Sequence, residues 1–325
     1  MPPPEPAVDT AVVEALVLRV DFGHCLLRLD DGSEREAVVR GKLMGRRKAL
    51  GNAVVVGDRV GFEVEGERTV VCGVRPRRNT FSRRASGERS EEQVVASDLD
   101  QVVLVASLLD PEFRPGLADR VLAQAEHAGI PARLVINKVD LGDPAEARAI
   151  VEDYTVAGAP GHTVCAKTGL GAEGLRHACV GRRSLFVGHS GVSKGTLLNT
   201  LFPELDLKSG LVNAKTGRGR HTTTAAWLLE PEPGLQVIDT PGVRTFGLWG
   251  IGPRDLEQAY VEFRRHLGTC RFRDCQHQNE PGCALLAAVK AGEVPRRRFE
   301  SFLKLREELE QETRLEYRRS SRGRV

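Results

Sequence analysis

The chain has 325 residues, of which 41% are hydrophobic and 28% charged, and its formal net charge is +3. This length suits two or three folded domains, because single hydrophobic cores stop growing near this size. No apolar run approaches the length of about 18 residues that predicts a membrane span, so no membrane contact is expected. Residues 1–11 lack the basic and apolar segments of a secretory signal and are expected to be a disordered lead-in.

Lysine and arginine gather in four segments: Lys42–Lys48, Arg75–Arg84, Pro295–Phe299 and Tyr317–Arg324. Each segment taken alone fits a solvated surface or tail. Four of them in one chain favour a polyanionic partner, because such clusters attract a phosphate backbone. The cysteines number seven, and three of them crowd into one short segment near the C-terminus. This usage does not suit a disulfide framework and indicates a reducing, cytoplasmic compartment and a metal site.

Residues 12–85 are expected to form a small β-barrel. The segments EALVLRVDFGHCLLRLDDGSEREAVVRG and AVVVGDRVGFEVEGERTVVCGV alternate apolar and polar residues between turn signals. Asp31-Gly32 lies between two of these runs and is a hairpin signal. About five short strands in about 65 residues are typical of such a barrel. The polar stretch 77–93 is expected to be a flexible linker.

Residues 94–250 alternate buried strands with helices, as in a parallel sheet covered by helices on both faces. The expected strands are the apolar runs QVVLVASL, ARLVIN, HTVCA, SLFVG and LQVID. Helical spacing follows in GLADRVLAQAEHAG and DPAEARAIVEDYTVAG. Ligands of such sheets bind beyond the carboxyl ends of the strands, so the chemistry is expected directly after each run.

Residues 251–325 are expected to form a helical domain with a basic tail. PRDLEQAYVEFRRHL and RRRFESFLKLREELEQETRLEYRR have amphipathic helical spacing. Between them, CRFRDCQHQNEPGC contains Cys270, Cys275, His277 and Cys283. Three thiolates and one imidazole fill the tetrahedral shell of Zn²⁺ and leave no open position, which predicts one structural zinc ion.

Two motifs suited to a guanine base follow buried strands. Asn137-Lys138-Val139-Asp140 comes directly after ARLVI. The Asp140 carboxylate can accept hydrogen bonds from the ring N–H and the amine of guanine, Asn137 can bond the other base edge, and the Lys138 stem can cover the ring. Cys165-Ala166-Lys167 follows HTV and forms a turn whose backbone N–H groups can meet the guanine carbonyl.

A phosphate site is expected from Gly188 to Thr196, GHSGVSKGT, where a strand, a turn and a helix follow one another. The backbone N–H groups and Lys194 can hold phosphates there. Asp239, at the end of LQVID, and Gly242 form a D-x-x-G motif that suits a magnesium ion and a terminal phosphate. The loop GRGRHTTTAAWL between them can offer a threonine hydroxyl to magnesium.

The order of these motifs is permuted. An ordinary GTPase runs phosphate loop, switch threonine, D-x-x-G, N-K-x-D and base turn, whereas here N-K-V-D and C-A-K come first. Circular permutation preserves the spatial site, because a doubly wound sheet tolerates new termini in its surface loops. The joint occurrence of the motifs predicts a guanine-nucleotide-binding fold.

The barrel, the permuted motifs and the cysteine cluster together resemble the RsgA (YjeQ) family of bacterial GTPases. The segments GRGRHTTT, DTPGVRTFGL and CRFRDCQHQNEPGC carry the resemblance, which covers the chain from about Val12 through the cysteine cluster. It implies an OB-fold barrel, a circularly permuted GTPase domain and a zinc-binding domain. It also implies GTP hydrolysis in late maturation of the 30S ribosomal subunit, stimulated by that subunit. GTP or GDP with Mg²⁺ and 16S rRNA are then the expected ligands, and the chain is expected to be monomeric.

By this resemblance, the nucleotide is bound by Asn137, Lys138, Asp140, Cys165, Ala166, Lys167, Gly188, His189, Ser190, Gly191, Val192, Ser193, Lys194, Gly195, Thr196, Thr222, Thr223, Thr224, Asp239 and Gly242. Val243 occupies the place after D-x-x-G where many GTPases have a water-orienting glutamine. His221 is our candidate for that role. A contact to phosphate or RNA without a catalytic part is the alternative for His221.

Two positions depart from the usual pattern. Cys165 replaces a serine, with little effect expected because the backbone does the reading there. The pattern G-x-x-x-x-G-K-[ST] has glycine where Ser193 stands and a hydroxyl where Gly195 stands. A glycine before the lysine allows close backbone approach to phosphate, and a hydroxyl after the lysine binds magnesium. Thr196 carries a hydroxyl, but it lies one residue after Gly195 and is therefore rotated by about 100° around the helix axis. The alternative function is therefore a 30S- and rRNA-binding assembly factor with weakened GTP binding or turnover.

Overall fold

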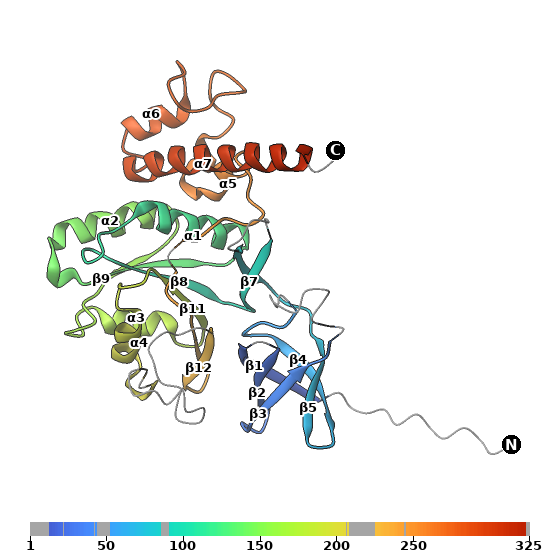
Figure 1. Cartoon of the computed structure of the whole chain (residues 1–325). Helices are drawn as coiled ribbons and strands as arrows, with labels where there is room; N and C mark the ends of the chain where they lie inside the picture. Colours follow the sequence, from blue (N-terminus) through green and yellow to red (C-terminus); the bar gives the residue numbers. More distant parts are fainter. Residues whose placement is uncertain are drawn as a thin grey trace.

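The computed structural model describes residues 13–21, 23–41, 43, 53–85, 91–205, 207, 225–243 and 245–322, with side chains of the last helix described to residue 315. A β-barrel, a helix-covered sheet and a helical region follow one another along the chain (Figure 1). The predicted fold class is confirmed. The lead-in, most of Lys42–Lys48, the side chains of Tyr317–Arg324, and His221, Thr222, Thr223 and Thr224 lie outside the described residues.

Five strands form the N-terminal barrel: β1 (Val13–Asp21), β2 (His24–Leu29), β3 (Glu34–Val39), β4 (Arg59–Glu65) and β5 (Arg68–Val74). Their order is β1-β2-β3-β5-β4, and pairing of β1 with β4 closes the barrel. Along β1, Ala15 and Val17 face the barrel core. Leu16 and Leu18 on the other side join the core of the central domain. This strand is therefore buried on both faces and ties the two domains together.

A two-stranded antiparallel sheet replaces the flexible linker that the polar stretch predicted. It consists of β6 (Thr80–Arg84) and β7 (Glu92–Ser97). Phe81 in β6 is fully buried and packs on Phe246, with ring centroids 5.6 Å apart. The Ser82 hydroxyl donates to Glu92 across the pair at 2.7 Å. Because one aromatic residue anchors these otherwise polar strands, the expectation of a linker was wrong.

The central sheet has the order β10-β9-β8-β11-β13-β12. The strands are β8 (Gln101–Ser107), β9 (Ala132–Asn137), β10 (Gly161–Thr163), β11 (Arg183–Gly188), β12 (Trp227–Glu232) and β13 (Leu235–Asp239). All except β12 are parallel, which confirms the predicted parallel sheet. β12 also pairs with β1 through Trp227 and Arg19, so the sheet continues into the barrel. The Arg19 guanidinium stacks 4.6 Å from the Trp227 ring centroid.

Helices cover both faces of the central sheet, on either side in Figure 1. One face carries α1 (Pro115–His127) and α2 (Pro144–Val156), and the other carries α3 (Ala172–Cys179) and α4 (Lys194–Leu201). Short 3₁₀ turns occur at η1 (Val139–Leu141) and η2 (Pro203–Leu205). Each face has its own hydrophobic core, so the sheet is held rigid between the two helical layers.

The C-terminal region consists of α5 (Leu256–Ala259), the 3₁₀ helix η3 (Val261–His266), α6 (Ala284–Lys290) and α7 (Arg296–Arg322). The single helix expected over PRDLEQAYVEFRRHL is broken at Tyr260, whose backbone is extended. This break lets Tyr260 bury its ring against Phe263 and Phe302. Helix α7 lies across α1 and α2, which joins the helical region to the central domain (Figure 1).

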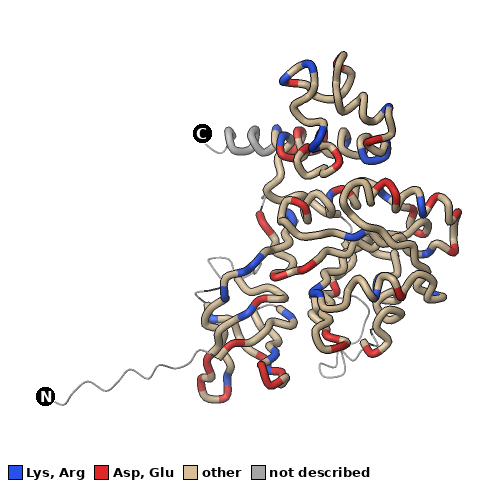
Figure 2. Tube along the Cα trace, turned by 180° about the vertical axis from the view of Figure 1, so that it is seen from behind, with Lys and Arg blue, Asp and Glu red and all other residues tan. Residues whose placement is uncertain are grey.

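Figure 2 shows basic and acidic residues interspersed along the described chain. The basic segment Arg75–Arg84 is largely paired: its arginines contact Glu14, Asp58, Asp100 and Glu312. In Pro295–Phe299 the arginines contact Glu300, Asp153, Asp119 and Glu262. Arg298 is engaged within the fold, whereas Arg78 and Arg296 are paired but remain 57% and 79% exposed, so part of this basic surface stays accessible. Among the described residues, no helix is both long and apolar enough to cross a membrane.

Candidate functional site: a nucleotide site and a cysteine–histidine cluster

The nucleotide motifs come together at the carboxyl ends of neighbouring parallel strands. The phosphate loop follows β11, Asp239 ends β13 and Asn137 ends β9. The backbone N–H of Val243 donates to the Gly188 carbonyl at 2.9 Å. A Cβ added at Gly242 would lie 3.0 Å from the Ser190 Cα, so glycine permits this close approach. The phosphate loop and the D-x-x-G segment therefore lie against each other.

Lys194 is the central charge of the phosphate loop. Its side chain is buried at the start of α4, where it forms an ion pair with Asp239 and donates to the Thr240 carbonyl. Asp239 is also buried. The helix N-terminus adds unpaired backbone N–H groups at the same place. The ammonium group and these N–H groups together make a site for an anion.

The two residues beside Lys194 differ in conformation and surroundings. Ser193 is left-handed, with φ 62° and ψ 38°. This is a conformation that glycine adopts freely and other residues adopt at a cost of about 1–2 kcal/mol. Gly195 is exposed, and a Cβ added there would meet no heavy atom within 4 Å. The exchange thus places a side chain where the backbone favours glycine and removes one where there is room.

Asn137 holds two loops together. It is fully buried, its side-chain N–H donates to the Val192 carbonyl at 2.9 Å, and its side-chain oxygen accepts from the Ala166 N–H at 3.0 Å. The phosphate loop and the base turn are therefore fixed relative to each other by one amide. The direct contact to a base edge stays a prediction, because the amide keeps a second N–H and a second oxygen lone pair beside these two bonds.

Asp140 is exposed in the middle of η1. The Cys165 thiol lies 3.2 Å from the Asp140 carboxylate and donates to it. The Cys165 side chain therefore has a contact that the sequence did not predict, while the small effect expected of replacing serine by Cys165 stays a prediction. Lys138 has a left-handed backbone, and its ammonium group donates to the Asp110 carbonyl. Lys167 is exposed beside the turn.

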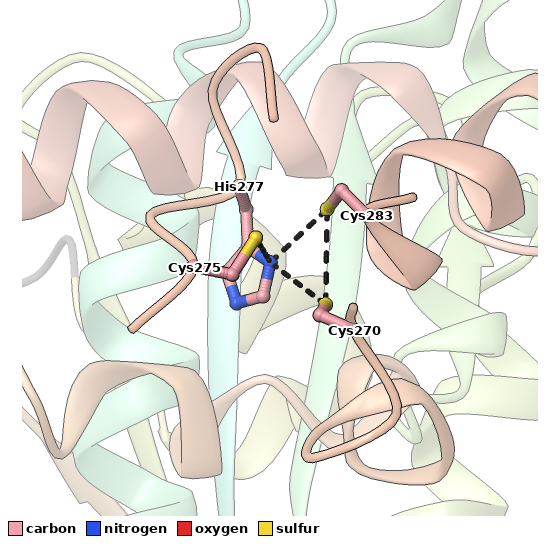
Figure 3. A group of neighbouring side chains, drawn as sticks. All are labelled: Cys270, Cys275, His277 and Cys283. Atoms are coloured by element: carbon pink, nitrogen blue, oxygen red, sulfur yellow. Dashed lines mark hydrogen bonds between the residues drawn. The ribbon is translucent and has the colours of Figure 1, made fainter. Parts of the chain in front are cut away.

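Cys270, Cys275, His277 and Cys283 form a compact cluster (Figure 3). The His277 Nδ1 lies 3.2 Å from the Cys283 sulfur and 3.6 Å from each of the other two sulfurs. The Cys270 and Cys283 sulfurs are 3.9 Å apart. A tetrahedral zinc ion would place sulfurs about 3.8 Å apart and sulfur and nitrogen about 3.5 Å apart, from its bond lengths. The residues therefore fit Zn²⁺.

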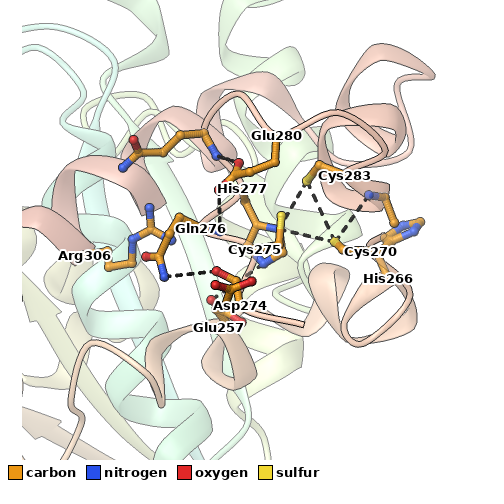
Figure 4. Close-up of polar contacts among 12 residues, drawn as sticks. Glu257, His266, Cys270, Asp274, Cys275, Gln276, His277, Glu280, Cys283 and Arg306 are labelled. Atoms are coloured by element: carbon orange, nitrogen blue, oxygen red, sulfur yellow. Dashed lines mark hydrogen bonds and ion pairs between the residues drawn. The ribbon is translucent and has the colours of Figure 1, made fainter. Parts of the chain in front are cut away.

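Neighbouring groups orient this cluster (Figure 4). Glu257 Oε1 lies 3.7 Å from His277 Nε2, and this carboxylate raises the pKa of His277 to about 9. Carboxylates in this place commonly fix the tautomer of a metal-ligating histidine. Glu280 accepts backbone N–H bonds from Gln276, Gln278 and Asn279, which lower the pKa of Glu280 to about 2. The loop that presents Cys275 and His277 is thus organised by one carboxylate.

Several residues with a structural part in the site carried no signal in the sequence. Glu257 lies 20 residues before His277, and neither it nor Glu280 belongs to a spacing pattern. The Thr200 hydroxyl in α4 donates to the Ala166 carbonyl at 2.7 Å and so braces the base turn. A hydroxyl facing backward along a helix is a common local contact, so the sequence did not distinguish Thr200.

Comparison with known proteins agrees with the motifs and with the fold. The sequence profile of the RsgA GTPase family matches residues 74–249. A protein of Gemmatimonas aurantiaca named small ribosomal subunit biogenesis GTPase RsgA is 41% identical over 285 residues, which cover 86% of this chain and 92% of that protein. A protein of the same name from Chlorobaculum parvum is 40% identical, covering 80% and 86%.

Solved structures agree with this comparison. The crystal structure of YjeQ from Thermotoga maritima superposes with a TM-score of 0.68 at 29% identity, covering 91% of this chain and 98% of that one. YloQ, described as a circularly permuted GTPase, has a TM-score of 0.65 at 24% identity, covering 92% and 96%. The second likeness supports the fold, including its permuted order of motifs.

Proposed function

Because this chain belongs to the RsgA GTPase family, we propose that it hydrolyses GTP as an assembly factor of the small ribosomal subunit. The observation that carries the proposal is the meeting of four motifs at one edge of the sheet. The base turn and the phosphate loop are bridged by Asn137, and the phosphate loop contacts the D-x-x-G segment. Family membership favours this function over an assembly factor with impaired GTP turnover.

In the proposed complex, Asp140 accepts hydrogen bonds from the guanine N–H groups while the Cys165 thiol holds the carboxylate in place. The phosphates lie on the backbone N–H groups of the loop and the N-terminus of α4. Lys194 exchanges its partners Asp239 and the Thr240 carbonyl for phosphate oxygens. The ion pair seen in the structure therefore competes with nucleotide for the same ammonium group.

Val243 is a poor candidate for orienting the attacking water. Its side chain is apolar and buried, and its backbone N–H is bound to Gly188. We retain His221 for this role, with ribosomal RNA as a partner that helps order it. Replacing His221 with Ala is expected to lower subunit-stimulated kcat by about 10²-fold, the range of a lost proton-transfer or water-positioning group. Unchanged kcat with weaker subunit binding would instead assign His221 to RNA contact.

The cysteine cluster is proposed to hold one structural zinc ion through Cys270, Cys275, His277 and Cys283. Zinc with four protein ligands supplies folding free energy rather than catalysis. The remaining basic segments, Lys42–Lys48 and Tyr317–Arg324, are proposed to contact 16S rRNA in the 30S subunit. We further propose that the protein acts in the cytoplasm as a monomer with GTP or GDP bound.

The test is GTP turnover by the full chain with and without small ribosomal subunits. We expect stimulation of at least about tenfold, since a partner that completes a GTPase site raises kcat strongly. Asp140→Asn is the matched control: it is expected to lose GTP turnover and to gain turnover of xanthosine triphosphate, whose base accepts where guanine donates. Subunit binding without hydrolysis would support the alternative function. A GTP turnover rate that is unchanged by added ribosomal subunits would refute the proposed role.

A further inference from the structure

The phosphate loop of this chain offers no hydroxyl at the position where related loops hold magnesium. In P-loop GTPases, Mg²⁺ is held by the serine or threonine after the lysine and by the aspartate of D-x-x-G. The first position is Gly195, and an added Cβ there meets no heavy atom within 4 Å among the described residues, its chain neighbours and the backbone of α4 set aside. Within that radius, the described residues outside this helix therefore supply no oxygen in place of the missing hydroxyl.

The second usual protein ligand is paired with Lys194 in the structure. The Asp239 carboxylate is buried and forms an ion pair with Lys194, which also donates to the Thr240 carbonyl. When Lys194 turns to the phosphates as proposed above, this pair opens and Asp239 is the one usual protein ligand left for the ion. Lys194 then supplies the phosphates with a positive charge without a metal.

Hydroxyl groups near Lys194 do not replace the missing magnesium ligand. Ser193 precedes the lysine and has a left-handed backbone. Thr196 lies one residue further along α4, a turn of about 100° around the helix axis. The Thr200 hydroxyl is bound to the Ala166 and Thr196 carbonyls. The residues described around Lys194 therefore do not fit the magnesium site that the fold implies.

We propose that this protein binds guanosine diphosphate without help from magnesium, using Lys194 and the N-terminus of α4 as its phosphate charges. The inference rests on the nucleotide binding proposed above. By linkage, the factor by which Mg²⁺ raises GDP affinity equals the factor by which the protein raises the affinity of GDP for Mg²⁺. A phosphate loop that adds no ligand to the ion, with Asp239 alone remaining, gives a factor of only a few.

The experiment measures GDP affinity of the full chain by isothermal titration calorimetry, in excess Mg²⁺ and in excess EDTA. GDP is the probe because it lacks the terminal phosphate that the loop of Thr222, Thr223 and Thr224 is expected to meet. The native chain is expected to show an affinity ratio below about threefold. Gly195→Ser is expected to raise this ratio to about tenfold or more, equivalent to about 1.4 kcal/mol.

Gly195→Ala is the matched control, since it adds the same Cβ in the same open space but no hydroxyl. Its ratio is expected to equal that of the native chain. A native ratio of tenfold or more would overturn the inference, as would equal ratios for the Ser and Ala variants. The affinity ratio of the native chain tests the inference by itself, so the test stands even where a variant fails to fold. Absence of GDP binding under both conditions would refute the proposed nucleotide site itself.

Discussion

Arg298 offers the sharpest test of how the helical region is held on the central domain. It projects from α7 with 2% exposure, and its guanidinium contacts Asp119 of α1 and Glu262 of η3. The same group lies 4.2 Å from the Tyr260 ring centroid and 5.1 Å from that of Tyr154. Although burial disfavours the cation, the two carboxylates raise the pKa of Arg298 well above its usual value.

Arg298→Met keeps the apolar stem and removes the charge. Asp119 and Glu262 are 0% and 1% exposed in their side chains, so both carboxylates would be left buried without a counter-ion. Breaking a buried pair in this way costs about 3–5 kcal/mol. Burial already raises the pKa of Asp119, and the loss of Arg298 removes the cation that opposes this shift, so the folded variant is penalised at neutral pH and the deficit shrinks as pH falls towards the ordinary carboxyl pKa of about 4.

The assay is scanning calorimetry of the zinc-loaded full chain at pH 7 and at lower pH. For a chain of 325 residues, a loss of about 4 kcal/mol corresponds to a fall in Tm of roughly 6 °C. Arg296→Met is the matched control, because Arg296 is 79% exposed and pairs only loosely with Glu300 at 3.9 Å. It is expected to change stability by less than about 0.5 kcal/mol. Equal falls in Tm for the two variants would refute the reasoning, as would a deficit that grows at low pH.

Three further predictions concern the two sites. Protein purified without chelator is expected to contain one zinc ion per chain by elemental analysis, and Cys283→Ser to lose it while Cys72→Ser, outside the cluster, retains it. Cys165→Ser is expected to tighten GDP binding about threefold by calorimetry and Cys165→Ala to weaken it, because a hydroxyl is a stronger donor to Asp140 than a thiol and a methyl group donates nothing. Tighter GDP binding by the Ala variant than by the Ser variant would contradict the thiol contact. Ser193→Gly is expected to raise the free energy of unfolding by up to about 1 kcal/mol, seen as a higher midpoint in urea denaturation, because glycine adopts the left-handed conformation without strain. A lower midpoint would contradict that account.

The positions of the motifs followed from the sequence because continuous apolar runs mark parallel strands buried on both faces. Asn137 and Asp239 each stand at the last residue of such a run, and the structure has them at the ends of β9 and β13. The spacing of the cysteine cluster was equally informative, since ligands within 14 residues have few ways to lie apart. These features are local, and local pattern was sufficient to find them.

Features that depend on distant contacts were misjudged. The segment 77–93 is polar, yet Phe81 reaches Phe246 across 165 residues of chain and makes a paired strand. The sequence also did not predict that carboxylates from four other parts of the chain contact the arginines of Arg75–Arg84, while the polyanionic partner that these arginines favour stays a prediction. The local sequence shows that a charged or aromatic residue is present, but it does not show which distant residue contacts it.

The sequence by itself determined the permuted fold, the segments proposed to bind the base and the phosphates, and the set of residues suited to zinc. Only the tertiary structure decided which side chains of these segments contact one another. Asn137 bonds the phosphate loop and the base turn, and Cys165 bonds Asp140, because loops that follow separate strands meet at one edge of the sheet. Such roles arise from contacts between segments far apart in the chain, and no periodicity or spacing within one segment specifies them.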